Sequence, residues 1–497
     1  MRDLAHAIDR RRSALAATSV LARTTLVSAL VAFGSHLAAF VLGAIHHGAP
    51  WWSWLVMMLA DVTIAGGALM RPDRFQLRRF ALPAVLAIST NLIVLAPLPW
   101  VGDKYQLVLP VETVPAVAAG VIVMWLTLTL TPTSLAGRAG PGPAARRRRR
   151  PLVVVGIIVA AVAVFPLWLR TLDGIPLLRL VGGGGSVTED RQRALRELDS
   201  GALRLAVGTL RNVYLGFAAA WCTADWIRCR RDDPRRARRS LFVLTIVVAI
   251  AASFSLVTTE RSLLGQLVLA CAVAGVVATA RGRLTGRMTA GLVAAGLAFP
   301  LFVGLLVTSG SPLERLGAAT AGLRRRILYL PSDVMLHYFT AFPATGEHIG
   351  LSGTPKLSRL ATGEPFNLPG YIYDVYYRRE LTVAGNANGS FIGVGWANFG
   401  SWGVVLWCAM AGIGVVLLEG FVRRRGPRAA AALRGVFVVQ LGLLTQADLF
   451  RSVLSIAPGV LDLVIVVWLG ERVLSRRRDL TPAALRWRQR GTAATAS

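Results

Sequence analysis

The chain has 497 residues, of which 54% are hydrophobic and only 16% are charged, and its mean hydropathy is +0.55. A soluble globular protein carries about 25% charged residues, so a chain this apolar has too few polar groups to cover a water-facing surface. The same numbers exclude a disordered chain, a collagen-like fibre and a disulfide scaffold. The composition therefore favours a protein embedded in a lipid bilayer.

The net charge is +29, from 55 Lys and Arg against 26 Asp and Glu. On a soluble chain this excess would indicate nucleic-acid binding. Here most arginines stand in short clusters between apolar runs, which is the pattern that sets the orientation of membrane proteins. We therefore interpret the basic residues as a topology signal, and we expect the lipid bilayer, not nucleic acid, as the partner.

A helix that crosses the bilayer needs about 20 apolar residues. Runs of that kind recur along the sequence, and they predict an all-α polytopic membrane protein with about twelve transmembrane helices. The first run follows a basic N-terminus and is long enough to span, so we interpret it as a transmembrane helix and not as a cleaved signal peptide. The runs lie near residues 25–45, 50–70, 81–99, 113–132, 151–169, 204–226, 241–259, 262–280, 289–308, 391–419, 430–447 and 452–470.

The arginine clusters determine the predicted orientation. With the N-terminus inside, the inside segments hold 37 of the 55 Lys and Arg residues, and every one of these segments is basic. This distribution predicts that both termini are cytoplasmic. The inside segments are 1–24, 71–79, 133–150, 227–240, 281–288, 422–434 and the tail after 470.

The apolar runs divide the chain into three regions. Residues 1–308 contain the first nine predicted helices, residues 309–390 form one large helical and irregular extracytoplasmic loop, and residues 391–497 contain the last three helices and a cytoplasmic tail. A second outside segment, 170–203, has four consecutive glycines and then the charge pattern of a short amphipathic helix. Long loops in compact proteins tend to be functional, so the loop 309–390 is the predicted active-site element, facing outside.

Arginines in outside segments oppose the positive-inside trend, so we look for a specific role for them. A guanidinium group binds two phosphate oxygens at once, so several of them could hold a diphosphate. The alternative is local pairing with an acid, such as Arg261 with Glu260. The candidates for substrate binding are Arg261, Arg324, Arg325, Arg326, Arg378 and Arg379.

The loop also contains groups that could act as a general base on a sugar hydroxyl, because a carboxylate or an imidazole can accept its proton. The neighbours Glu347 and His348 are the most suggestive. Each of these groups could instead be a solvated surface side chain. The catalytic candidates are Glu347, His348, Asp374 and His337.

Tyrosines are dense between residues 371 and 377 of the loop. Tyr373 and Tyr376 could stack on sugar rings, or they could simply pack the loop on the bilayer. Neither a zinc-like Cys/His spacing nor a DxD-like acidic pair occurs in the outside loops, so we expect no metal and no other cofactor. Asp61, Arg211, Asp225 and Asp462 lie in or near predicted spans, where charged groups are costly unless they are paired or functional.

The sequence from Gly363 to Gly420 resembles the O-antigen, or oligosaccharide repeat-unit, polymerase family. In that family a long polar and aromatic outside loop leads through an Asn/Gly-rich entry into a helix with a phrase like GWANFGSWG (395–403) of this chain. The entry here contains Asn386 and Asn388, which we add to the substrate-binding candidates. TTERSLL (258–264) looks like the family's arginine turn. The pairs Arg378–Gly389 and Arg379–Gly395 fit arginine–glycine spacings of such polymerases.

The resemblance implies a metal-independent GT-C-type glycosyltransferase in the cytoplasmic membrane of a bacterium. Its donor and acceptor would both be polyprenyl-diphosphate-linked glycans. The non-reducing end of one repeat unit would attack the anomeric carbon of the other, releasing polyprenyl diphosphate, and arginines would hold the diphosphate. A chain-length regulator or a flippase would be its protein partners.

Three alternatives stay open. An O-antigen-ligase-like enzyme would share the donor and the topology but pass the glycan to another acceptor. A transferase using a polyprenyl-monophosphate sugar usually has an acidic motif in its first outside loop, and here that loop, residues 45–52, contains no acid. A flippase or exporter of lipid-linked glycan would predict a repeat between the two halves and a central polar cavity.

Overall fold

The structure is a computed structural model in which regular secondary structure is entirely helical over the residues that it describes. The all-α prediction is therefore confirmed for this part of the chain. Of the outside segment 170–203, almost all lies outside the described residues. Those residues are 27–38, 40–41, 51–70, 74–75, 80–98, 112–132, 152–172, 201–258, 262–279, 285, 288, 291, 311–343, 347–354, 366–377, 386–449 and 459–470.

Helices occupy every predicted apolar run that the structure describes, while the run near 289–308 lies outside the described residues apart from Gly291. Two apolar helices without a label cover Val27–Ala38 and Val460–Gly470. The labelled ones are α2 (Trp51–Met70), α3 (Leu82–Ser89), α5 (Thr113–Leu130), α6 (Leu152–Arg170), α9 (Gly201–Thr209), α10 (Leu215–Cys229), α11 (Pro234–Thr258), α12 (Ser262–Ala278), α18 (Phe391–Arg423) and α19 (Pro427–Leu444), with π-turns η2 (Thr90–Leu95) and η5 (Leu210–Tyr214).

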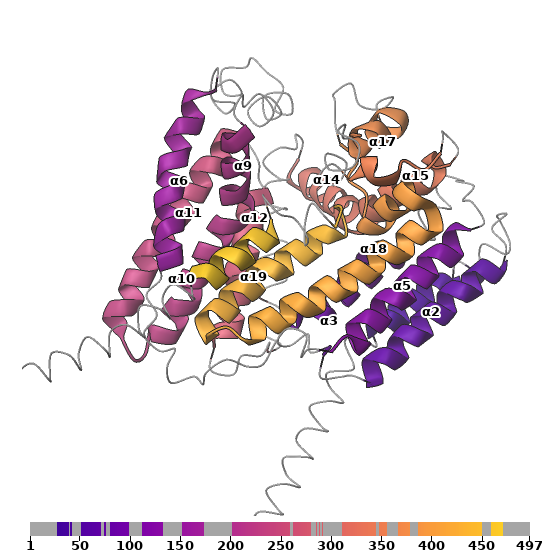
Figure 1. Cartoon of the computed structure of the whole chain (residues 1–497), viewed down its shortest axis with the longest axis horizontal. Helices are drawn as coiled ribbons and strands as arrows, with labels where there is room; N and C mark the ends of the chain where they lie inside the picture. Colours follow the sequence, from indigo (N-terminus) through magenta and orange to yellow (C-terminus); the bar gives the residue numbers. More distant parts are fainter. Residues whose placement is uncertain are drawn as a thin grey trace, which may run out of the picture.

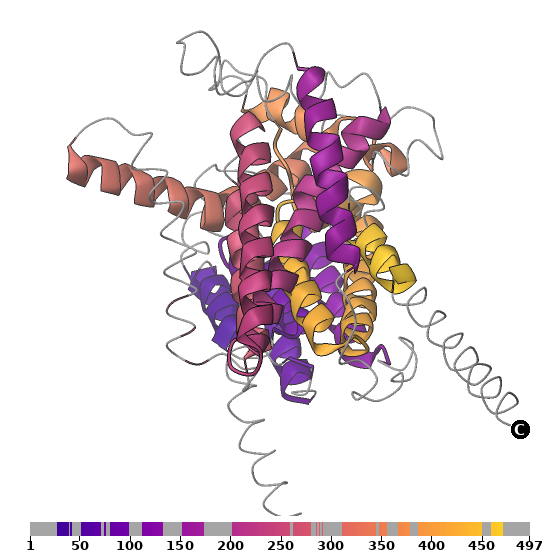
Figure 2. The same cartoon turned by 90° about the vertical axis from the view of Figure 1, so that its left-hand side faces the viewer.

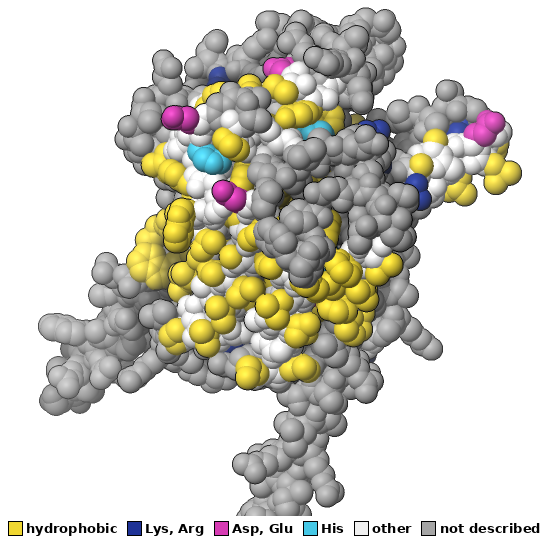
Figure 3. All heavy atoms as spheres, turned by 90° about the vertical axis from the view of Figure 1, so that its right-hand side faces the viewer, with side chains coloured by type: hydrophobic (Ala, Val, Ile, Leu, Met, Phe, Trp, Pro, Cys, Tyr) yellow, Lys and Arg dark blue, Asp and Glu magenta, His cyan; other side chains and the backbone are white. Residues whose placement is uncertain are grey.

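Five of the described helices, α5, α6, α11, α18 and α19, are long and apolar enough to cross a membrane. α6 and α11 bury little of their apolar surface inside the chain. Figure 3 shows hydrophobic side chains gathered over the middle of the molecule. These features fit a membrane protein, in which lipid covers the exposed apolar side chains. The total of about twelve spans stays a prediction.

The helices form two groups that lie side by side (Figure 1). In one group α10 packs against α11, α12 and α19, and in the other α5 lies between α2 and α18. α19 also contacts α3 and α18, so one continuous hydrophobic core joins the groups. Gly120 of α5 and Gly412 of α18 let their two helices approach, since a Cβ at either position would meet atoms of the other helix.

The large loop forms a group of short helices at one end of the bundle, which we call the crown. In Figure 1 the crown lies at the upper end, whereas the turns joining α10 to α11 and α18 to α19 lie at the lower end. This separation is what the predicted topology requires of the loop and of two basic inside segments. The crown consists of α14 (Pro312–Arg324), the π-turn η6 (Arg325–Tyr329), α15 (Leu330–Ala341), the 3-10 turn η7 (Gly350–Gly353) and α17 (Leu368–Tyr376).

Cysteine labelling in intact cells tests the orientation. A cysteine replacing exposed Asn367 in the crown should react with an impermeant thiol reagent, and one replacing exposed Arg235 should react only after the cells are opened. Gly350 is unsuitable because its φ of 58° disfavours any side chain. The reverse labelling pattern would mean that the orientation is wrong.

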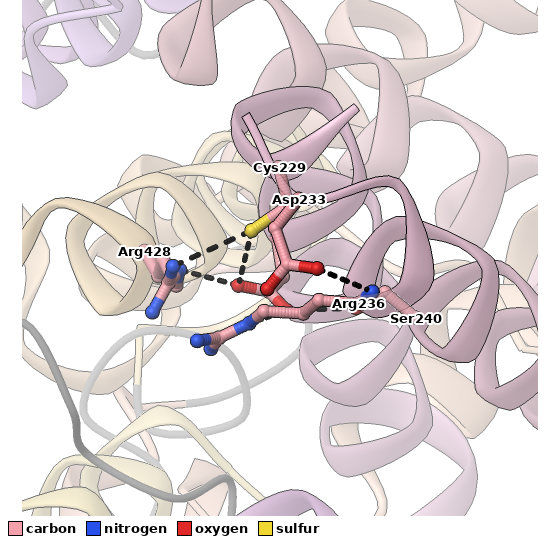
Figure 4. Close-up of polar contacts among 6 residues, drawn as sticks. Cys229, Asp233, Arg236, Ser240 and Arg428 are labelled. Carbon is pink, nitrogen blue, oxygen red and sulfur yellow. Dashed lines mark hydrogen bonds and ion pairs between the residues drawn. The ribbon is translucent and has the colours of Figure 1, made fainter. Parts of the chain in front are cut away.

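The basic end of the bundle is held together by buried carboxylates. Asp225 of α10, 7% exposed, accepts hydrogen bonds from Arg236 Nε at 3.1 Å and Ser240 Oγ at 2.7 Å, both in α11. It also pairs with Arg428 of α19, whose Nη2 lies 3.6 Å from Cys229 Sγ (Figure 4). The carboxylate lies near the C-terminal end of α10, where the helix dipole disfavours an anion, so the two arginines compensate it.

A second carboxylate links α18, α19 and α3 at this end. Glu419 of α18 is 1% exposed, and its Oε1 accepts hydrogen bonds from Arg423 and from Arg434 of α19, each at 2.7 Å. Its Oε2 accepts the backbone N–H of Leu82 at the start of α3 at 3.2 Å. Some arginines that we interpret as topology signals therefore also fasten helix ends.

We expect Asp225→Ala to lower the free energy of unfolding by about 2 to 4 kcal/mol, because it leaves two arginines facing each other without their shared acceptor. Asp232→Ala, exposed in the turn that follows α10, is the control and should change little. Thermal unfolding of the purified protein in detergent, followed by tryptophan fluorescence, measures both. Equal melting temperatures for the two variants would contradict a structural role for the Asp225 cluster.

Candidate functional site

The crown is attached to the membrane helices at a break in α18. Phe399 (φ −142°, ψ 21°) and Gly400 (φ 60°, ψ −141°) leave the helical conformation within the phrase GWANFGSWG. Gly395 and Gly403 face each other across the break, and a Cβ on Gly403 would overlap the carbonyl oxygen of Gly395. Residues 395–403 therefore form a joint, a non-helical break within α18 that glycine makes possible.

Crown residues 341–343 and 347–354 dock on this break through hydrogen bonds. Ala397 O, close to the break, accepts the N–H of Ile349 at 3.0 Å. Trp396 Nε1 donates to the carbonyl oxygen of Phe342 at 2.8 Å, and buried Asn398 Nδ2 donates to Thr354 Oγ1 at 2.9 Å. A helix break exposes backbone groups that need partners, and the crown supplies one of them.

The predicted pair Glu347 and His348 lies on this docked segment, and both side chains are exposed. The His348 ring packs edge-on against Trp396 with 5.8 Å between centroids. It also covers Gly400, because a Cβ there would lie 2.8 Å from His348 Nε2. The break in α18 therefore orients His348.

A different group surrounds His337 on α15, which is 6% exposed. Its ring stacks on Tyr376 at 4.2 Å between centroids and meets Tyr377 edge-on at 5.3 Å. Asp333, one turn earlier, lies 3.6 Å from His337 Nε2 and accepts a hydrogen bond from Tyr377 Oη at 2.9 Å. Tyr376 thus packs on an imidazole in this structure, and Tyr373 stacks on Tyr377 at 6.1 Å.

Burial lowers the pKa of His337 from its ordinary 6.5 to about 4, and Asp333 at 3.6 Å is too far for a strong hydrogen bond that would keep the ring charged. Between these values the unfolded segment binds more protons than the folded one. The free energy of unfolding of the crown should therefore be constant above about pH 6.5 and fall by up to about 3 kcal/mol as the pH drops toward 4.

Hydrogen exchange of the α15 amides, corrected for intrinsic rates, should show this loss of protection in the wild type between pH 7 and pH 4. The His337→Gln variant should lose less protection, because it removes the titrating group. Equal pH dependence in both proteins would mean that His337 is not the group whose protonation opens the crown.

Asn386 and Asn388 lie where the loop returns to α18, and both are exposed. The backbone on either side of Asn388 is held by Tyr338, whose Oη donates to Ala387 O at 3.0 Å and accepts from Gly389 N at 3.3 Å. Asn388 lines a narrow crevice with Tyr338 and with Asp448, which follows α19. Asp448 Oδ1 accepts the Trp407 Nε1 hydrogen at 3.1 Å.

A second small pocket lies between α10, α12 and α19, in the half of the bundle nearer the crown. It is lined by Arg211, Asn212, Gln266 and Gln440 together with apolar residues. Arg211 is 8% exposed and lies in the π-turn η5, and its Nε donates to Asn212 Oδ1 at 3.3 Å. Gln440 Nε2 donates to Asn212 O at 3.4 Å. Single π-turns inside helices are frequent at functional sites.

The structure thus separates the predicted residues. His337, Tyr373 and Tyr376 come together, Glu347 and His348 lie at the joint, and Asp374 is exposed on α17. Exposed Arg324, Arg325 and Arg326 lie at the end of α14 and the start of η6. Arg261, Arg378 and Arg379 lie outside the described residues.

Sequence reasoning missed Asp448 as a site residue and treated Arg211 only as a costly intramembrane charge. Asp448 directly follows the apolar run 430–447, so its position gave no signal. For Arg211 the signal was present, since Gln266 and Gln440 are also polar residues in apolar runs.

In the part of the chain that the structure describes, no group of three metal-ligating side chains comes together. Comparison of the chain with models of known families, with curated proteins and with solved structures finds no match.

Proposed function

We propose that the protein is a membrane glycosyltransferase that polymerises polyprenyl-diphosphate-linked repeat units at the outer face of the cytoplasmic membrane. The observation that carries the proposal is the collection of groups at the crown end of the bundle. Tyrosines, an imidazole, carboxylates and asparagines suit the recognition of sugars, and the Arg211 pocket in the same half suits an anionic leaving group.

In the proposed reaction, a hydroxyl at the non-reducing end of the acceptor attacks the anomeric carbon of the donor. The new C–O bond forms as the bond from the anomeric carbon to the diphosphate oxygen breaks, and the diphosphate leaves with the electron pair. The hydroxyl proton passes to a general base. Exposed Glu347 and His348 suit this role best, because Tyr376 and Tyr377 cover His337.

The purified protein in nanodiscs, supplied with a lipid-diphosphate-linked repeat unit, should form a ladder of polymers. We expect the reaction to continue in EDTA, because the outside loops lack a DxD-like acidic pair. Glu347→Gln combined with His348→Asn should slow it about a hundredfold, whereas Glu314→Gln on exposed α14 should not. Absence of transfer from the lipid-diphosphate donor would contradict the proposal.

The ligase alternative is separated by the glycans that accumulate when the protein is absent from cells. Single lipid-linked repeat units indicate a missing polymerase, because the units can no longer be joined. Finished polymer that stays on its lipid carrier indicates a missing ligase. The second outcome would leave the proposed donor and site unchanged, but the acceptor would be a molecule other than a second repeat unit.

A further inference from the structure

Helix α14 leaves the bundle sideways. In Figure 2 it projects away from the bundle and runs across the direction of α11. Its start is closed by its own capping box, in which Ser311 Oγ accepts from Glu314 N at 3.4 Å and Glu314 Oε2 accepts from Ser311 N at 2.8 Å. Of its residues with a described side chain, Ala319 alone is buried. The helix is therefore well defined without being covered by the described part of this chain.

The exposed surface of α14 is divided into an apolar and a polar face. Leu313 and Leu316 are three residues apart and so share one face, and they are 82% and 44% exposed. Glu314 and Arg315 project to the other side of the helix at this spacing. In Figure 3 the protruding helix turns its hydrophobic atoms toward the hydrophobic middle of the molecule and its acidic atoms away from it.

The charge of the helix and its end suits an anionic surface. Residues 312–326 contain four arginines and a single acid, Glu314. Arg324, Arg325 and Arg326 are exposed, and the Arg324 guanidinium lies over the Tyr329 ring at 6.0 Å from its centroid. Arginine with tyrosine is a combination typical of the boundary between lipid and water.

We propose that α14 is an interfacial helix that lies on the bilayer surface at the crown end. Leu313 and Leu316 insert among the acyl chains, and Arg324, Arg325 and Arg326 bind phosphates of anionic phospholipids. This gives the three arginines a lipid partner in place of the substrate diphosphate that sequence analysis suggested. Because η6 joins α14 directly to α15, the contact would also fix the height of the crown above the membrane.

The full-length protein in nanodiscs tests the lipid contact. Leu316→Cys and Ala318→Cys, on opposite faces of α14, are each labelled with a fluorophore that is sensitive to polarity, and the unsubstituted protein gives the background from the native cysteines. We expect the label at 316 to be shifted to the blue and quenched by brominated lipids, and the label at 318 to behave as in water.

The arginines are tested by comparing neutral phosphatidylcholine discs with discs that also contain phosphatidylglycerol. The anionic lipid should increase quenching at 316. Replacing Arg324, Arg325 and Arg326 together by Gln should reduce that increase about fivefold or more. A triple replacement of Arg235, Arg238 and Arg239, exposed at the other end of the bundle, is the matched control.

Three results would contradict the proposal, the first two as a whole and the third for its arginines. Labels at 316 and 318 that are equally water-exposed in the discs would show that α14 stands free in solvent. Protection at 316 that rises with protein concentration in detergent, without quenching by brominated lipid, would show that a second copy of the chain covers the face. An unchanged response to phosphatidylglycerol in the Gln variant would remove the role of the arginines. None of these readouts depends on glycosyl transfer.

Discussion

Gly403→Ala is expected to lower the free energy of unfolding by about 3 kcal/mol. The added methyl group would overlap the carbonyl oxygen of Gly395, which is backbone and cannot turn away as a side chain would. The two glycines hold the parts of α18 together on either side of the break at Phe399 and Gly400. Relief of the overlap would have to move Trp396 or Asn398, which anchor the crown.

Helix propensity offsets part of the lost free energy of unfolding, since alanine is favoured over glycine in a helix by about 1 kcal/mol. Gly442→Ala in α19 isolates that contribution, because a Cβ there would meet no atom within 4 Å. The control should be neutral or slightly stabilising. Thermal unfolding in detergent gives the comparison, and a Gly403→Ala protein that melts together with the wild type would contradict the proposed joint.

Gly400→Ala is a second change at the break, and it strains the backbone because φ 60° with ψ −141° is a conformation that favours glycine. The residue has φ 60°, and its new methyl group would lie 2.8 Å from His348 Nε2, the far end of a side chain that can move. The strain therefore falls both on the backbone of α18 at the break and on the segment that carries Glu347 and His348. We expect Gly400→Ala to disturb the stability of α18 and the placement of the predicted base together.

Much of the fold follows from local sequence. Apolar runs locate the helices because about 20 apolar residues have no other stable form in lipid. The loop 309–390 is recognisable because its turns, prolines and charges interrupt these runs. The helix predicted near 391–419 begins as expected, but its break could not be predicted from the sequence, since it depends on Gly395 and Gly403 meeting in space.

The arrangement of the site is set by contacts between distant residues, which periodicity cannot reveal. Asp448 accepts a hydrogen bond from Trp407 and shares a crevice with Asn388, and no local pattern connects these three residues. The same holds for Asp225 and Arg428, which are about 200 positions apart and pair at the basic end. Sequence analysis identified Asp225 as a charge in need of a partner, and the fold supplied that partner.

Arg211→Ala is expected to reduce turnover of a lipid-diphosphate-linked glycan by about a hundredfold. In the proposed reaction the departing diphosphate gains negative charge in the transition state, where a fixed guanidinium group helps most. Arg211 lies 18 residues before the end of α10, a helical rise of about 27 Å, which places it near the outer edge of the hydrocarbon layer if α10 ends at the inner edge. Arg261 precedes α12, whose Gln266 lines the same pocket.

The matched control is Arg204→Ala, an exposed residue of α9 two turns before Arg211, which should leave turnover unchanged. Arg211→Lys should restore activity only in part, because a point charge lacks the planar pair of donors.

The same assay, at matched membrane abundance, tests Arg261→Ala, Arg378→Ala and Arg379→Ala. Each variant should lose about a hundredfold in turnover if its arginine contacts the diphosphate. Turnover near the wild-type rate in Arg211→Ala would leave that arginine a structural role beside Asn212. If Arg261→Ala, Arg378→Ala and Arg379→Ala were equally active, the diphosphate site itself would have to be sought elsewhere at the crown end.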